Sequence, residues 1–282
     1  MISLDQGHRP VKSVDALWLL NLCYKMLSVL LASGKSMSKK PITVYWAPAF
    51  NIDQNDNDWS LLYLKPKSLY KELQETRFEG APSGNLLACP AFSNKHKNTY
   101  VFRSSQPCHY QYDYENNNKV LNTLDPRSYY LSSTRDQAFS FGPSFEFSFH
   151  HIFFADEPLT ASFTPPYYHE PKHTKYGASV PGEFDIGQWF RPFNFEIQTW
   201  KNKSEIIIEE KEPLFYVEFK TDRPIIFKEF LINKQLANYS RMCSKSQNIL
   251  GFGKSLLSKY TRFNEVGLRE KILFEIKNNT IG

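Results

Sequence analysis

The sequence predicts a mainly β fold, a single β-sandwich or distorted barrel of the cupin or jelly-roll kind with a helical C-terminal extension. Two observations support this expectation. The 282 residues include 23 Phe, 16 Tyr and 5 Trp, and aromatic residues are enriched in strands. Several short segments also alternate apolar and polar residues, which is the period of a half-buried strand. With 41% hydrophobic and 22% charged residues, the composition is that of a folded globular protein rather than a disordered or fibrous one.

We expect three regions along the chain. Residues 1–36 are either an N-terminal helical extension or lie upstream of a true start at Met37, because apolar residues within 14–32 recur at steps of three and four. Residues 41–228 form the β-rich core, and residues 229–282 form a basic helical extension. Charged and amide residues interrupt the apolar N-terminal run, whereas a bilayer span needs about 20 predominantly apolar residues. No integral membrane association is therefore expected.

In the first half of the chain the strongest predicted strand is SFEFSFHHIFF, residues 144–154, because Phe145, Phe147 and Phe149 share one face. Ser68 is the expected cap of a short helix. The expected elements are, in order, strands at 42–46 and 59–64, a helix at 68–78, and strands at 99–103, 110–114 and 144–154.

In the second half, residues 165–192 are expected to form a long loop rich in Pro, Gly, Tyr and His. Long loops in compact domains commonly carry function or cover a site. Phe193, Phe195 and Ile197 are predicted to share one face of the following strand. The other expected elements are strands at 159–163 and 193–200, a hairpin of 205–210 and 214–220, an extended segment at 223–227, and helices at 230–243 and 255–277.

The formal net charge of +5 is unevenly distributed: residues 41–219 sum to −6 and residues 220–282 to +7. Basic segments attract phosphates. Binding of a nucleic acid or a protein partner through residues 229–282 is therefore one hypothesis, and a solvated helical face is the simpler interpretation. The four cysteines have no regular spacing, which favours a reducing compartment, the cytoplasm, or the host-cell cytoplasm if the protein is viral.

His169 and His173 are the first candidate metal ligands. They lie in the sequence HEPKH, which matches the H-E-x-x-H motif of zinc hydrolases. That chemistry requires both histidines on one helical turn. Pro171 between them argues against a continuous helix, so a histidine-rich surface loop is the simpler interpretation.

His150 and His151 are the other candidate metal ligands. As neighbours on a strand they point to opposite faces, so only one of them could join the loop histidines. With Glu146 or Glu183, such a pair could form the facial iron site of a cupin-like enzyme. Iron or zinc is expected only under this alternative, and otherwise no cofactor is predicted. No P-loop, dinucleotide-binding motif or nucleophile elbow occurs in the sequence.

Residues 41–225 resemble a functionally uncharacterised β-rich protein family found in bacteria and tailed phages, including cyanophages. The family places a Pro-Phe strand that ends near a Trp before a hairpin containing Gly-Glu-Pro. The matching residues are Pro192, Phe193, Trp200, Ile206, Ile208, Glu212 and Pro213. Glu210 and Lys211 stand where the family usually has Lys-Gly, which puts the turn in doubt. The resemblance implies a fold and a phage-like or marine-bacterial setting, and no activity.

The sequence therefore favours a phage-type, non-enzymatic binding or structural module, with no catalytic residue identified. Two alternatives stay open. One is a cupin-like metal-dependent enzyme that uses His150 or His151 together with His169 and His173. The other is nucleic-acid binding through the basic segment 229–282.

Overall fold

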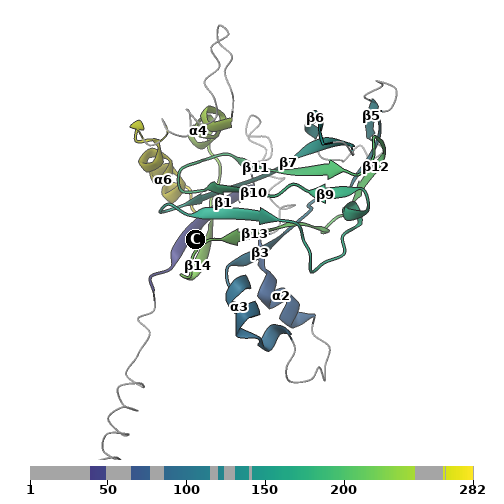
Figure 1. Ribbon diagram of the computed structural model, residues 1–282. Coiled ribbons are helices and arrows are strands. Elements are labelled where there is room, and N and C mark those ends of the chain that lie inside the picture. The colour runs from purple at the N-terminus through teal and green to yellow at the C-terminus, as the bar shows by residue number, and fades with distance from the viewer. Residues whose placement is uncertain are drawn as a thin grey trace, which may run out of the picture. The chain divides into compact units, whose positions relative to one another are not determined.

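Three β-sheets and several short helices make up the part of the chain that the computed structural model describes. The described residues are 39–48, 65–76, 86–114, 120–123, 131–139, 142–244, 263 and 265–281. The chain divides into two units, residues 1–40 and 41–282, and all three sheets belong to the second. The mainly β architecture with helices near the carboxyl end confirms the predicted fold class (Figure 1).

The largest sheet, sheet A, is built around one long strand. That strand, β7, pairs with β11 along one edge and with β6 and β1 along the other. All these pairings are antiparallel, whereas β14 pairs with β1 in parallel. The order is β14-β1-β7-β11-β9 with β6 beside β7. The strands are β1 (Ile42–Pro48), β6 (Leu131–Phe139), β7 (Gly142–Ala155), β9 (Gly177–Ser179), β11 (Pro192–Thr199) and β14 (Ile225–Glu229).

Sheets B and C lie opposite sheet A. Sheet B has the order β10-β8-β13-β3-β2 and sheet C the order β12-β4-β5. The strands of sheet B are β2 (Lys67–Ser68), β3 (Thr99–Arg103), β8 (Thr160–Thr164), β10 (Gly182–Asp185) and β13 (Pro213–Phe219). Those of sheet C are β4 (Cys108–Asp113), β5 (Val120–Thr123) and β12 (Lys203–Ile208).

An aromatic core joins sheet A to the other two sheets. Phe153 of β7 contacts Phe102 of β3 with ring centroids 5.2 Å apart. Phe147 of β7 contacts Tyr110 of β4 at 5.7 Å. Both phenylalanines of β7 are fully buried. Because each ring removes a large apolar area from water, these contacts hold the layers together as a sandwich.

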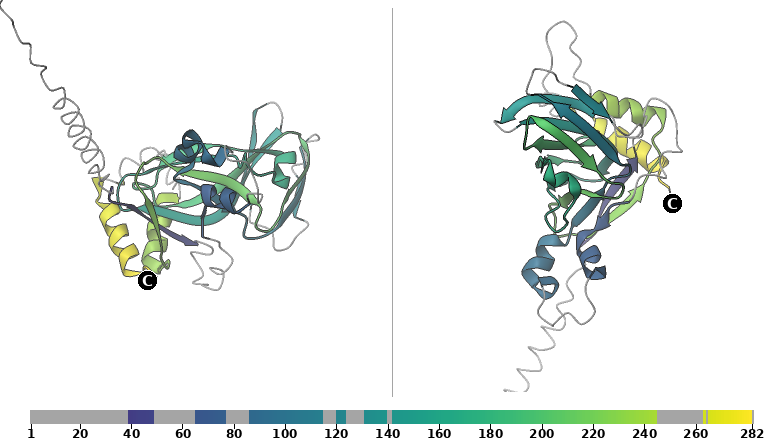
Figure 2. Two further views of the ribbon diagram at one scale, coloured as in Figure 1. Left: turned by 90° about the horizontal axis from the view of Figure 1, so that it is seen from below. Right: turned by 90° about the vertical axis from the view of Figure 1, so that its right-hand side faces the viewer.

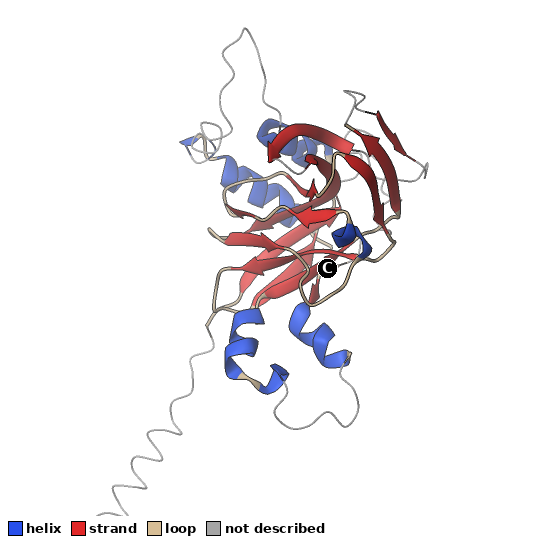
Figure 3. Cartoon of the chain, turned by 45° about the vertical axis from the view of Figure 1, so that its right-hand side comes forward, coloured by secondary structure: helices blue, strands red, loops and turns tan. Residues whose placement is uncertain are grey.

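Helices cover the outer faces of sheets A and B. Helices α4 (Lys234–Ser244) and α6 (Leu268–Asn278) pack on sheet A, where Leu236 and Ile272 share a buried cluster with Phe154. Helix α2 (Leu69–Glu75) packs on sheet B, where Leu69 contacts Val101 and Tyr216. Figures 2 and 3 show these helices on opposite sides of the strands. The other helical segments are α3 (Pro90–His96) and the 3-10 turns Leu86–Ala88 and Lys172–Lys175.

Several local predictions are confirmed. Phe193, Phe195 and Ile197 of β11 are all buried on the core face. The hydroxyl of Ser68 accepts a hydrogen bond from the Lys71 amide and caps α2. None of the described helices has the length and apolar character needed to cross a membrane.

The predicted hairpin of residues 205–210 and 214–220 is wrong. Strand β12 pairs with β4 in sheet C, whereas β13 pairs with β3 and β8 in sheet B. The intervening turn carries the chain from one sheet to the other, with Lys211 at φ 62°. The Glu212 carboxylate stabilises this turn by accepting a hydrogen bond from the Glu209 amide at 2.7 Å. Turn residues predict that the chain reverses, and they do not determine which strand each arm joins.

The predicted loop 165–192 also needs correction, because it contains β9, β10 and the 3-10 turn Lys172–Lys175. These strands are too short to show the alternation by which strands are recognised in a sequence. The predictions for residues 1–36, for a strand at 59–64 and for the first part of the helix at 255–277 lie largely or wholly outside the described residues.

Candidate binding cleft

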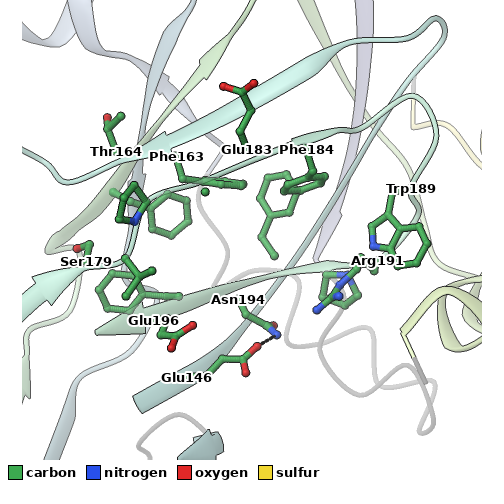
Figure 4. Close-up of a pocket in the computed structure, with 17 residues that line it drawn as sticks. Glu146, Phe163, Thr164, Ser179, Glu183, Phe184, Trp189, Arg191, Asn194 and Glu196 are labelled. Atoms are coloured by element: carbon green, nitrogen blue, oxygen red, sulfur yellow. Dashed lines mark hydrogen bonds between the residues drawn. The ribbon is translucent and has the colours of Figure 1, made fainter. Parts of the chain in front are cut away.

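A cleft of about 630 Å³ lies between sheet A and sheet B, where β11 of one sheet faces β8 and β10 of the other. Its size falls within the 300–1,000 Å³ that is typical of small-ligand sites. Figure 4 shows its lining side chains. They are Glu146, Phe163, Thr164, Ser179, Val180, Pro181, Gly182, Glu183, Phe184, Trp189, Arg191, Pro192, Phe193, Asn194, Phe195, Glu196 and Phe215.

Aromatic rings from four strands form the apolar wall of the cleft. The ring of Phe193 in β11 lies 4.8 Å from that of Phe163 in β8 and 5.0 Å from that of Phe184 in β10, both edge to face. Phe195 and Phe215 stack at 5.9 Å. Because these rings support one another, the apolar wall is already formed without a ligand.

Polar side chains occupy the opposite side of β11. Glu196 of β11 and Glu146 of β7 are directly opposite each other in the strand register. The side-chain amide of Asn194 donates a hydrogen bond to Glu146 (Figure 4). The hydroxyl of Ser144 donates to Glu196 at 2.7 Å. Burial lowers the pKa of the Arg191 guanidinium, and the nearby Glu146 carboxylate opposes that change. Arg191 is half-buried at this side of the cleft, near the Glu146 carboxylate.

The rim of the cleft consists of the two-residue connection from β9 to β10 and the first two residues of β10. Val180, Pro181, Gly182 and Glu183 are all exposed there. A Cβ atom added at Gly182 would meet only Phe163, at 3.8 Å, which is ordinary van der Waals contact. A Cβ atom at this position therefore fits without backbone strain.

The structure places three of the four candidate histidines in separate surroundings. His151 is buried in the aromatic core, with its ring 5.7 Å from Phe102 and 6.1 Å from Phe153. His173 is also fully buried, and its Nδ1 lies 2.7 Å from Oε1 of Glu212. His150 belongs to β7, and its side chain is outside the described part of the structure.

His169 belongs to a second polar cluster, on the outer face of sheet B. Its Nε2 lies 2.7 Å from Oε1 of Glu72, and its Nδ1 lies 2.6 Å from the Tyr216 hydroxyl. Arg103 also binds the same Glu72 oxygen. The second oxygen of Glu72 is buried without a hydrogen-bond partner among the described residues. Burial raises the pKa of Tyr216, so its hydroxyl stays protonated at neutral pH. We call Glu72, Arg103, His169 and Tyr216 the Glu72 cluster.

The described side chains of His151, His169 and His173 do not converge on one site. His169 precedes the 3-10 turn that contains His173, so the two histidines do not share a helical turn, as Pro171 indicated. In the ranges that the structure describes, no three His, Cys, Asp or Glu side chains are grouped to hold a metal ion. Sequence spacing does not reveal the true partners of these histidines, because Glu72 and Glu212 lie 97 and 39 residues away along the chain.

Ser179, His173 and Glu212 have the residue types of a hydrolytic triad. The Ser179 hydroxyl lies 3.5 Å from Nε2 of His173, but it donates to the Leu214 carbonyl at 3.1 Å. Ser179 is also only 4% exposed. A covered hydroxyl bound to a carbonyl is poorly placed to attack a substrate, so this arrangement supports the cleft wall.

The sequence did not identify the cleft, although it marked the segment 165–192 that supplies its rim. The sequence indicated Glu146 and Glu183 only as possible carboxylate ligands of a metal. It did not indicate Arg191, Asn194 or Glu196. The break in register between β7 and β11 at Phe193 and Asn194 lies at the cleft, and no sequence pattern indicated it.

No family model and no curated protein matches the chain. The resemblance to the phage family therefore stays a prediction.

Proposed function

We propose that the chain is a non-enzymatic binding module that holds a partly apolar ligand in the cleft between β10 and β11. The observation that carries the proposal is the cavity of about 630 Å³, with aromatic rings on one side and Glu146, Glu196 and Arg191 on the other. A preformed apolar pocket with a few convergent polar groups is the usual form of a ligand site.

The other hypotheses have less support from the described residues. For nucleic-acid binding, the basic residues of the C-terminal helices would need to face a phosphate backbone. Among these residues, Arg269 of α6 does not face solvent alone, because it donates to the carbonyls of Gly187 and Ala155 at 2.9 and 3.4 Å and so attaches the helix to the sandwich. For a metal-dependent enzyme, the histidines would need to converge, and His151, His169 and His173 each have different neighbours.

A neutral fluorescent dye tests the cleft without knowledge of the natural ligand. We expect the naphthalene dye prodan to bind saturably, with a blue-shifted emission and one site per chain. Gly182→Phe should abolish this binding, because the new ring would fill the mouth beside Phe163. Val266→Phe is the matched control, because it adds a ring at an exposed position outside the cleft.

The folded state of both variants is checked by circular dichroism. Equal dye binding by Gly182→Phe and Val266→Phe would show that the dye binds elsewhere, and would contradict the proposal. Absence of saturable binding to the unmodified chain would contradict it as well.

A further inference from the structure

We infer that the ligand of the cleft is an extended peptide that pairs with β11 as an added strand, an inference that depends on the proposed binding function. The pairing of β11 differs between its two edges. Strand β7 pairs with β11 from Pro192 to Gln198, whereas β9 pairs only with 197–199. The β9 ladder ends where the Val180 amide donates to the Glu196 carbonyl at 2.8 Å. In the described residues, no strand pairs with the first part of β11 on that side.

The backbone direction at this edge follows from the last hydrogen bond of the ladder. Successive residues of a strand direct their backbone groups to opposite edges. Because the Glu196 carbonyl points toward β9, the amide and carbonyl of Asn194 point to the same edge. Asn194 also lines the cleft. An uncovered strand edge is a template for another strand, and addition of a strand to such an edge is an established mode of peptide recognition.

The dimensions of the cleft suit a short extended segment. Four residues of β11, Pro192–Phe195, precede the end of the β9 ladder. At about 3.4 Å per residue they span roughly 14 Å. A peptide of four or five residues would therefore continue the line of β9.

The lining of the cleft also matches an added strand, because it includes both faces of β11. Phe193 and Phe195 lie on the core face, and Asn194 and Glu196 lie on the other face. A strand paired with β11 would direct alternate side chains to these two faces. One set would contact the aromatic wall, and the other would lie beside Glu196 and Glu146.

The negative charge of the cleft favours basic residues among the peptide side chains that would lie beside Glu196 and Glu146. Three carboxylates, those of Glu146, Glu183 and Glu196, line the cleft together with one guanidinium, that of Arg191. The whole chain, in contrast, has a net charge of +5. Opposite charges favour association and like charges disfavour it. The expected occupant is therefore a peptide that alternates apolar and basic residues.

The probe is the blocked peptide acetyl-Val-Lys-Val-Lys-Val-amide, titrated into the full chain by calorimetry. The charge control replaces both lysines by glutamates, and we expect it to bind at least about tenfold more weakly. In the double variant E146Q/E196Q this difference should become smaller. Gly182→Phe should prevent binding, and Val266→Phe should leave it unchanged.

Backbone methylation distinguishes strand pairing from simple occupation of the cavity. Alternate amides of a paired strand face the partner strand. Two methylated peptides should therefore differ in affinity for the chain. One carries N-methyl groups on the two lysines, and the other carries them on the central and last valines. One of these peptides should lose about tenfold or more in affinity, because hydrogen bonds to β11 are removed, and the other should bind within about threefold of the parent peptide.

The outcomes separate this inference from the proposed function. Prodan binding without peptide binding at millimolar concentration would overturn the added strand and leave the ligand-binding module intact. Equal losses for the two methylated peptides would also overturn it, because the peptide would not be paired along one edge. Failure of both dye and peptide to bind would overturn both proposals.

Discussion

The Glu72 cluster and the cleft both contain glutamate carboxylates, but these carboxylates have different partners. In the Glu72 cluster a buried carboxylate is bound by Arg103 and by His169. These partners come from β3 and from the segment after β8, so the cluster connects α2 to sheet B. In the cleft, Glu146 and Glu196 accept hydrogen bonds from the neutral groups of Asn194 and Ser144. The Glu72 carboxylate therefore connects elements of the fold, whereas the carboxylates of Glu146 and Glu196 line a cavity that a ligand can enter.

The largest expected effect of a substitution concerns the Glu72 cluster. Glu72→Ala should destabilise the fold by about 3–5 kcal/mol, because the partly buried Arg103 guanidinium loses its carboxylate partner and the His169 ring loses a hydrogen bond. Glu75→Ala on the same helix is the matched control. The Glu75 carboxylate is 61% exposed and pairs with Lys67, so its loss should change stability by less than about 0.5 kcal/mol. Urea titrations measure both, and similar losses would show that the Glu72 cluster does not stabilise the fold.

Truncation of a side chain in the apolar wall of the cleft should clearly lower the free energy of unfolding, because this wall is part of the core. Phe195 is 2% exposed and contacts Phe147 and Phe215. Phe195→Ala should cost about 3 kcal/mol, near the lower end for such truncations, because the space vacated joins an existing cavity. Glu196→Ala, the neighbouring substitution, removes the hydrogen bond from Ser144 and should cost about 1 kcal/mol. Equal losses in denaturant titrations would mean that the register of β11 is wrong.

The sequence predicted well those strands whose burial alternates residue by residue. Phe193, Phe195 and Ile197 face the core because a strand directs every second side chain to one side. The sequence did not predict which sheet each strand enters. Strands β12 and β13 are separated by one short turn and belong to different sheets, because pairing depends on distant strands such as β4 and β3.

The candidate site was less predictable than the fold, for a related reason. The motif containing His169 and His173 predicts zinc only if its residues lie on one helix. Their actual partners are Glu72 and Glu212, which no local pattern connects to them. The cleft is formed by side chains of several strands from two sheets, and a cavity of this kind follows from the packing of layers rather than from any one segment.

An intermediate effect is expected at Glu212, behind the wall of the cleft. Burial would raise the pKa of the Glu212 carboxyl, but hydrogen bonds from the His173 ring and from the amides of Glu209 and His173 lower it overall. Glu212→Gln should therefore cost about 1.5–3 kcal/mol at pH 7, because hydrogen bonds to a charged group are lost.

The lowered pKa of Glu212 also sets the pH dependence of this effect. Its contribution to stability is complete above the pKa of an unfolded glutamate, about 4.3. It is lost as the pH falls below that value and through the lower pKa of the folded state. Denaturant titrations from pH 7 to pH 3 should show a larger acid loss for the unmodified chain than for Glu212→Gln. Parallel curves for the two proteins would contradict the assignment of the pKa.

The smallest effect on stability is expected at the rim of the cleft, where Gly182→Phe should change the free energy of unfolding by less than about 0.5 kcal/mol. Gly182 is exposed, and its added Cβ atom meets only Phe163 at 3.8 Å.

Gly177 of β9 provides the contrast, because a Cβ atom there would lie 2.4 Å from the Gln198 carbonyl oxygen. Gly177→Ala should therefore cost about 1–3 kcal/mol through overpacking. Thermal unfolding of both variants decides the point. If Gly182→Phe keeps the stability of the unmodified chain while Gly177→Ala lowers it, the space at the cleft is open and the neighbouring β9 ladder is closely packed. A large loss at Gly182 would mean that the cleft is already filled.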